Sequence, residues 1–232
     1  MWSTWLVATN SITRADATYR RLRSDILTGR LSAGSRLAFP ELSERYDVSV
    51  GTFREALPRL VEQGLVVYQP QVGFRVMTPS VEDLRHLTEV RVAVETIALR
   101  QSVRDGDLAW ESNLLAAHHT LARTPWHLEE RQINDAWLEA HLTFHRVLLQ
   151  GCPNRRLTGI ADLLRDSAEI YRWWHARPEP YDRDIASEHQ EILDAALARD
   201  FDAAAAALTK HLELNEELHL RAHGEDVDAT HD

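Results

Sequence analysis

The segment Val48-Ser-Val-Gly-Thr-Phe-Arg-Glu-Ala-Leu57 decides the fold of the first third of the chain. Ser49 is a favourable N-cap residue, and the apolar residues after it recur at helical spacing, so a helix is predicted over residues 50–63. A glycine directly after that span ends the helix. Upstream, the same kinds of signal predict helices over residues 14–29 and from Pro40 to Tyr46.

Two short β-like runs follow the third predicted helix. They are Leu65-Val-Val-Tyr68 and Gly73-Phe-Arg-Val-Met77, and the turn segment Gln69-Pro-Gln-Val72 between them predicts a hairpin. Three helices followed by a hairpin is the order of a winged helix-turn-helix. We therefore predict a DNA-binding domain over residues 14–77, preceded by a loose arm at residues 1–13.

The third helix of such a domain lies in the major groove of DNA, and its N-terminal residues face the base edges. Arg54 is the best candidate contact, because an Arg can bind guanine O6 and N7 in bidentate geometry. The alternative is that Arg36 and Arg54 are solvated surface charges. The residues predicted to contact DNA lie before, within and after the helix-turn-helix, and they are Arg36, Ser49, Thr52, Arg54, Gln71 and Gly73.

The net charge of −10 is unevenly distributed along the 232 residues. Residues 14–77 carry ten Arg against seven acidic groups, a balance of +3, whereas residues 78–232 carry 16 basic and 29 acidic groups, a balance of −13. Such asymmetry is typical of a basic binding module joined to an acidic body. The alternative is that the two halves are soluble domains that differ in composition for no functional reason, which would give the same charge pattern.

Cys152 is the single cysteine of the chain and cannot form an internal disulfide. A reducing compartment is therefore expected, which indicates the cytoplasm. Binding to its DNA site would place the protein at the nucleoid. The apolar start of the chain, residues 1–7, is too short for a signal peptide or a transmembrane helix. No contact with a membrane is predicted.

A short linker at residues 78–81 leads into a second half that shows no strand pattern. Ser80 is the predicted N-cap of its first helix. Glycine and proline breaks divide residues 82–222 into six helices, which predicts an all-helical bundle, followed by a polar tail at residues 223–232. The expected helices of this mainly α fold span residues 81–104, 107–123, 130–151, 154–176, 182–199 and 201–221.

The segment quoted first, together with Leu60-Val-Glu-Gln-Gly-Leu-Val66, resembles the recognition-helix motif of the GntR family of regulators. Three further segments fall where that family has them, namely Gly34-Ser-Arg-Leu37, Glu41-Leu-Ser-Glu44 and Gly73-Phe-Arg-Val76. Two positions depart from the family pattern. Val50 stands where an Arg commonly follows the cap, and Pro58 lies in the helix interior, where a kink near Arg54 is expected.

Several segments of the second half resemble the FCD effector domain of FadR-type GntR regulators. They are Arg91-Val-Ala-Val-Glu95, His141-Leu-Thr-Phe-His-Arg-Val-Leu-Leu149, Cys152-Pro-Asn154, Glu188-His-Gln-Glu-Ile-Leu-Asp-Ala195 with Asp200, and His211-Leu212. In many such domains an Asp and three His bind a divalent metal, and the resemblance places the three His at His145, His189 and His211. His141 stands at the Asp position, which would make the ligand set all-nitrogen.

The residues alone support this metal site only in part. With 12 His in the chain, about 0.6 pairs at i,i+4 spacing would arise by chance. Spacing therefore does not choose between the pairs His141/His145 and His219/His223. Imidazole ligands suit a divalent transition metal, zinc first, with nickel, iron and manganese as other candidates. The alternative is that these His are scattered over helix surfaces, as is expected of the remaining His.

The predicted effector is a small carboxylate or dicarboxylate, bound between the metal and Arg91, with Arg172 as a second candidate contact. Within the family, the chain resembles the glutarate-responsive regulators, and this resemblance implies glutarate. Arg91 and Glu95 could equally form a plain i,i+4 ion pair. Trp137 and the Trp173-Trp174 pair are expected in the core or at a dimer interface rather than around a ligand.

Together these features predict a transcription repressor that binds an inverted repeat of double-stranded DNA as a homodimer, with an operator affinity controlled by its effector. One alternative is a regulator that senses the metal itself. Another is a metal-dependent hydrolase built on a helical bundle. An enzyme is disfavoured, because the sequence has no His-Glu-x-x-His, no Gly-x-Ser-x-Gly and no phosphate-binding loop.

Overall fold

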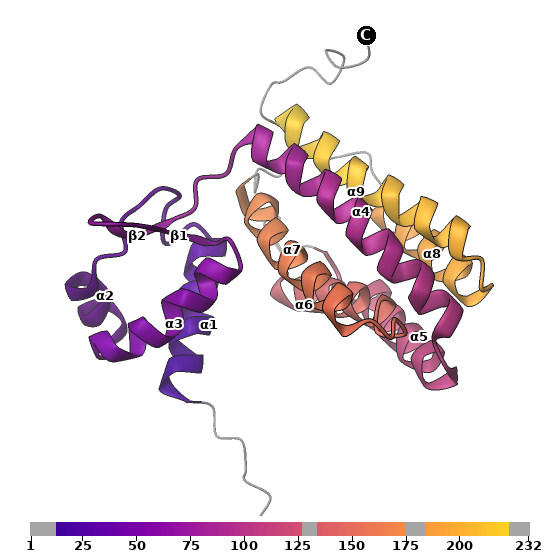
Figure 1. Ribbon diagram of the computed structural model, residues 1–232, viewed down its shortest axis with the longest axis horizontal. Helices are drawn as coiled ribbons and strands as arrows, with labels where there is room; N and C mark the ends of the chain where they lie inside the picture. Colours follow the sequence, from indigo (N-terminus) through magenta and orange to yellow (C-terminus); the bar gives the residue numbers. More distant parts are fainter. Residues whose placement is uncertain (1–12, 127–133, 175–183, 223–232) are drawn as a thin grey trace, which may run out of the picture. The chain divides into compact units, whose positions relative to one another are not determined.

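The computed structural model describes residues 13–126, 134–174 and 184–222 (Figure 1). The chain divides into two compact units, Met1–Thr78 and Pro79–Asp232. The predicted fold class, a winged helix-turn-helix followed by a helical bundle, is confirmed. The predicted tail, and all of the predicted arm except Thr13, fall outside the described ranges. Within those ranges, no helix is both long and apolar enough to cross a lipid bilayer.

The N-terminal unit contains three helices and a two-stranded antiparallel sheet, in which Val66 pairs with Val76 and Gln69 with Gly73. Its elements are α1 (Arg14–Leu27), α2 (Phe39–Tyr46), α3 (Val50–Glu62), β1 (Val66–Gln69) and β2 (Gly73–Val76). The predicted cap is present, since the Ser49 side chain accepts a hydrogen bond from the Thr52 N–H. Local capping chemistry therefore fixes where the third helix begins.

The core of this unit forms along the inner face of α3. Phe53, Leu57 and Leu60 are completely buried, and the Phe53 ring lies edge-on to Tyr46 at a centroid separation of 5.9 Å. Tyr46 in turn donates a hydrogen bond of 2.5 Å to Asp25 of α1. The α3 helix runs from Val50 to Glu62 with Pro58 inside it, so the proline does not end the helix.

The C-terminal unit is entirely helical in the part that the structure describes (Figure 1). Its helices are α4 (Val81–Asp105), α5 (Leu108–Arg123), α6 (Asp135–Leu148), α7 (Arg155–Trp174), α8 (Ile185–Leu197) and α9 (Phe201–Ala222). Helix α6 is shorter than the predicted span 130–151, because Asn134 caps its start and the backbone leaves the helix after Leu148. Helix α4 packs against both α7 and α9, while α5 packs against α6.

One continuous hydrophobic core fills the bundle. Its completely buried members include Leu99, Leu114, Phe144 and Leu208, which come from four different helices. Trp137 belongs to this core, as predicted. The side chains of Trp173 and Trp174 lie outside the described part of the chain.

The backbone of α4 and the turn after α6 approach each other closely around Ser102. The Ser102 hydroxyl donates a hydrogen bond of 2.7 Å to the Leu148 carbonyl. A Cβ atom added at Gly151 would lie 2.5 Å from the Ser102 carbonyl oxygen, so only glycine fits here. By contrast, a Cβ at Gly159 on the exposed side of α7 would meet nothing within 4 Å.

We expect Gly151→Ala to lower the free energy of unfolding of the C-terminal unit by about 1–3 kcal/mol, because the added methyl group forces the backbone of α4 away. Gly159→Ala is the matched control and should raise stability by roughly 0.5–1 kcal/mol, because alanine costs less conformational entropy in a helix. Urea titrations of the full-length variants followed by circular dichroism measure both effects. Equal midpoints for Gly151→Ala and the wild type would contradict this account of the turn.

Candidate functional site

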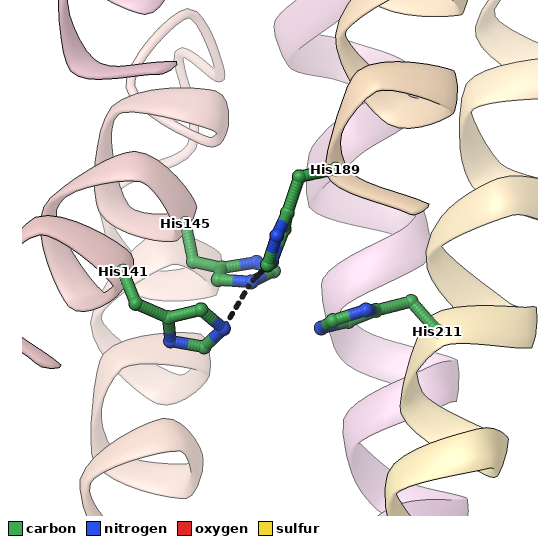
Figure 2. Close-up of side chains that lie close together, drawn as sticks. All are labelled: His141, His145, His189 and His211. Carbon is green, nitrogen blue, oxygen red and sulfur yellow. Dashed lines mark hydrogen bonds between the residues drawn. The ribbon is translucent and has the colours of Figure 1, made fainter. Parts of the chain in front are cut away.

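Four buried His side chains meet in the interior of the C-terminal unit (Figure 2). His141 and His145 project from α6 one turn apart, and α8 and α9 each contribute one more, His189 and His211. One ring nitrogen from each of the four lies within 4.8 Å of the others. The structure thus brings the predicted four-His cluster together from three helices, and His189 alone stands 44 residues after His145 in the chain.

Three ring nitrogens of this cluster converge on one another. The Nε2 atom of His145 lies 3.2 Å from Nε2 of His141 and 3.3 Å from Nε2 of His189 (Figure 2). A neutral imidazole carries one N–H donor and one acceptor nitrogen, so in the tautomer with the proton on Nδ1 the three converging Nε2 atoms direct their lone pairs at one another. This is the arrangement that a cation stabilises.

The charge state of His145 favours metal binding. Burial, with a further contribution from His211 and His189 and then from Arg165 and Arg91, holds the pKa of His145 well below its ordinary value. His145 is therefore a neutral imidazole at neutral pH, which is the form that ligates metals.

A buried carboxylate orients one ring of the cluster. The Nδ1 atom of His211 lies 2.8 Å from Oε2 of Glu188, the residue directly before His189 on α8. A carboxylate at Nδ1 selects the tautomer that presents Nε2, and a His ligand commonly has such a partner. Glu188 belongs to a motif recognised in the sequence, but its role in the site could not be read from that motif.

A second buried group, the Arg91–Glu95–Arg165 triad, joins α4 to α7. Arg91 Nε donates to Glu95 Oε1 at 2.8 Å, and Arg165 Nη2 donates to Glu95 Oε2 at 3.3 Å. Burial alone would raise the pKa of Glu95, but the charges of Arg91 and Arg165 outweigh it, so the pKa is lowered. The i,i+4 ion pair between Arg91 and Glu95, which the sequence offered beside a role for Arg91 in effector binding, is therefore present.

Sequence reasoning missed Arg165, whose partner Glu95 stands 70 residues earlier in the chain. The Arg165 side chain is almost completely buried, and its Nη1 also binds Asp162 at 2.9 Å. Among the described residues, nothing accepts a hydrogen bond from its Nε. The side chain of Arg172, the weaker effector candidate, lies outside the described residues.

The predicted DNA contacts lie at the surface of the N-terminal unit. Arg36, Ser49 and Arg54 are exposed and Thr52 is half-buried at the start of α3. The hairpin tip turns through two residues with positive φ, Gln71 at 65° and Gly73 at 97°. Val50, where the family commonly has Arg, is also exposed on the first turn of α3.

A winged helix-turn-helix joined to a helical bundle that buries a ligand-type cluster is the architecture of a two-domain transcription regulator. Residues 14–76 match the gntR family of bacterial regulatory proteins, and residues 86–214 match the FCD domain. The chain belongs to the GntR family of DNA-binding transcriptional regulators and has the FadR-type arrangement with an FCD domain.

Relatives of known sequence and structure support this assignment. The chain is 40% identical over 204 residues to the HTH-type transcriptional regulator BphR of Paraburkholderia xenovorans, covering 85% of this chain and 82% of that one. It is 31% identical over 206 residues to the repressor GlaR of Escherichia coli, and the match covers 87% of this chain and 93% of GlaR.

Solved structures show the same fold. A GntR regulator from Rhodococcus sp. RHA1 shares 26% identity and a TM-score of 0.69 over 90% of this chain and 98% of its own. The E. coli protein McbR/YncC shares the fold at a TM-score of 0.72 and 17% identity. The match covers 92% of this chain and 100% of McbR/YncC. BphR, GlaR and the Rhodococcus protein are transcriptional regulators and not enzymes.

Proposed function

We propose that the protein is a repressor that binds an inverted-repeat operator as a homodimer in the cytoplasm, and that a small carboxylate bound at a metal site controls its operator affinity. The observation that carries the proposal is the buried four-His cluster that α6, α8 and α9 bring together. The repressor assignment is supported by the names of two relatives, GlaR and RspR.

The four-His cluster suits a divalent transition metal. Its ligand atoms are imidazole nitrogens, which zinc, nickel and iron accept readily and which magnesium and calcium do not favour. The interior position and the Glu188 contact at His211 are also typical of metal-bound His. Four nitrogen ligands suit tetrahedral zinc, and an octahedral ion such as nickel, iron or manganese would leave positions for an effector.

We expect the purified protein to carry about one divalent transition ion per chain, because the four buried imidazoles can supply a tetrahedral ligand set. His145→Ala/His189→Ala should abolish that content, and Glu188→Gln should weaken metal affinity by roughly 10–100-fold. Elemental analysis and competition with a chelating dye measure these changes. His119→Ala, on the exposed face of α5, is the control, and equal metal content in the double variant and in this control would exclude the site.

The proposed effector is a small carboxylate or dicarboxylate, and glutarate is the first compound to test. Arg91 uses its Nε for Glu95, but a guanidinium has five N–H donors, so others remain for a ligand. A carboxylate also supplies oxygen ligands to a metal ion. The residues proposed to bind it are Arg91 and Arg172.

We expect glutarate, or another C4–C6 acid, to bind the metal-loaded protein and to lower its operator affinity. Arg91→Ala should weaken that binding roughly 10–150-fold, since a hydrogen bond to a charged group contributes about 1.5–3 kcal/mol. Isothermal titration calorimetry measures it, with Arg100→Ala as the control on the exposed side of the same helix. Carboxylate binding that is unaffected by Arg91→Ala and by chelation would reject this mechanism. An operator response to metal alone would instead establish a metal-responsive regulator.

We expect Arg54→Ala to weaken operator binding by about 1–3 kcal/mol and to relax the preference at one base pair, because a bidentate contact to guanine is lost. Gel-shift titration on the operator and on its single-base variants measures both effects. Arg104→Ala, at an exposed ion pair in the C-terminal unit, is the control. Unchanged operator affinity in Arg54→Ala would show that the start of α3 is not the base-reading segment.

A further inference from the structure

Helix α3 has a buried face and an exposed face, and Arg54 lies on the exposed one. Phe53, Leu57 and Leu60 are completely buried on the other side of the helix. Val50 precedes Arg54 by four residues, so the two side chains are neighbours one turn apart. Both of them are exposed. The surface that is proposed to face the bases therefore begins with an apolar side chain and continues with a charged one.

The exposure of Val50 is not explained by packing within the N-terminal unit. Within α3, all of which the structure describes, Val50 is the one large hydrophobic residue that is exposed. Apolar surface left in water adds nothing to stability, and it gains free energy when another apolar group covers it. Valine also has a lower helix propensity than alanine, leucine or arginine. A valine at this position therefore favours a role in binding over a role in folding.

Gly51 is a second residue that the stability of the helix does not explain. It stands three residues before Arg54 and four before Glu55, both exposed, so it lies on the same outer face of α3. Its φ is not positive. A Cβ atom added here would have the Ser49 Oγ at 3.6 Å as its nearest neighbour, which is an ordinary van der Waals contact.

The fold of the N-terminal unit therefore does not require glycine at position 51. Glycine inside a helix is less stable than alanine, and one of its uses is to let another molecule approach the backbone closely. Residues that break a local rule without a gain in stability are expected at functional sites. Val50 and Gly51 are two such residues, and they are adjacent in the first turn of the proposed recognition helix.

The major groove of DNA offers a partner for an exposed apolar side chain. Each base pair presents hydrogen-bonding groups there, but thymine also presents its C5-methyl group, which apolar side chains recognise by direct contact. Such a contact gains free energy only at van der Waals distance, because dispersion falls off steeply with separation. A short side chain such as valine must therefore be carried deep into the groove.

We propose that Val50 contacts the C5-methyl group of a thymine in the same half-site as the guanine read by Arg54, and that Gly51 lets the backbone of α3 approach the DNA closely enough for this contact. This inference rests on the proposed function, since it needs an operator that is read by the start of α3. An Arg at position 50 would select guanine. The departure of Val50 from the family motif is therefore a change in the preferred base.

The experiment begins with duplexes that the full-length protein selects from a randomised DNA pool. Each thymine of the selected site is then replaced by uracil, which lacks only the methyl group, and gel-shift titration measures the dissociation constants. We expect one thymine per half-site at which uracil weakens wild-type binding about 3–10-fold, the effect of losing one buried methyl group. In Val50→Ala the same replacement should change the affinity by less than about 2-fold, because the two changes remove the same contact.

Val90→Ala is the matched control, since Val90 is an exposed valine on α4, and it should keep the full wild-type response to uracil. A selected site in which no thymine is sensitive to uracil would overturn this inference. The same holds for a sensitive thymine whose response to uracil is unchanged in Val50→Ala.

Gly51→Ala tests the close approach. It should weaken operator binding roughly 5–150-fold, because an added methyl group overpacks the interface, while the unfolding midpoint stays at or above that of the wild type. Gly159→Ala, at an open position on α7, should leave operator affinity unchanged. Wild-type operator affinity in Gly51→Ala would overturn the close approach of α3 to the DNA.

Failure of this inference can be told from failure of the proposed function. If Arg54→Ala weakens binding to the selected site but no thymine methyl contributes, the proposed operator binding stands and the role of Val50 is rejected. If the protein selects no sequence from the randomised pool, the proposed operator binding and this inference fail together.

Discussion

The burial of charged and polar side chains between α4 and the helices around it is the constraint on which the C-terminal unit depends. An isolated ionic group in a protein interior costs several kcal/mol, so each such group needs a partner. Glu95 meets this need with two guanidiniums, and His211 meets it with Glu188. Removing Glu95 would take away the carboxylate that the two guanidiniums share. The position of α7 against α4 and of α8 against α9 is therefore fixed by polar chemistry as well as by apolar packing.

The aromatic side chains of α6 complete this arrangement. Trp137 stacks on His141 at a centroid separation of 4.9 Å, and Phe144 lies edge-on to both His145 and His189 at 5.3 Å. Because Trp137, His141 and His145 follow one another at four-residue spacing, they share one face of the helix. Rings held by such packing are orientated before any ligand arrives, which is the general requirement of a binding site.

The two units differ in where they place the residues that are proposed to bind their ligands. The N-terminal unit keeps its proposed DNA contacts exposed, and two of its other arginines serve its own structure, since Arg30 and Arg45 both bind Asp25. The C-terminal unit instead buries a few of its charged side chains, among them Glu95, Arg165 and Glu188. A regulator needs both properties in one chain, because base contacts require an open surface and a small ligand requires an interior.

Local signals in the sequence were enough to determine the winged helix-turn-helix and the helices of the bundle, whereas the four His that converge were predicted only through the resemblance to the FCD domain. Capping at Ser49 and Ser80, glycine and proline breaks, and apolar periodicity act over a few residues, so they can be recognised without a structure. Only the tertiary structure showed that Arg165 binds Glu95 and that Tyr171 binds Asp83, partners 70 and 88 residues apart in the chain. Periodicity shows which face of a helix is buried, but the residue that a buried side chain meets depends on how two helices pack against each other.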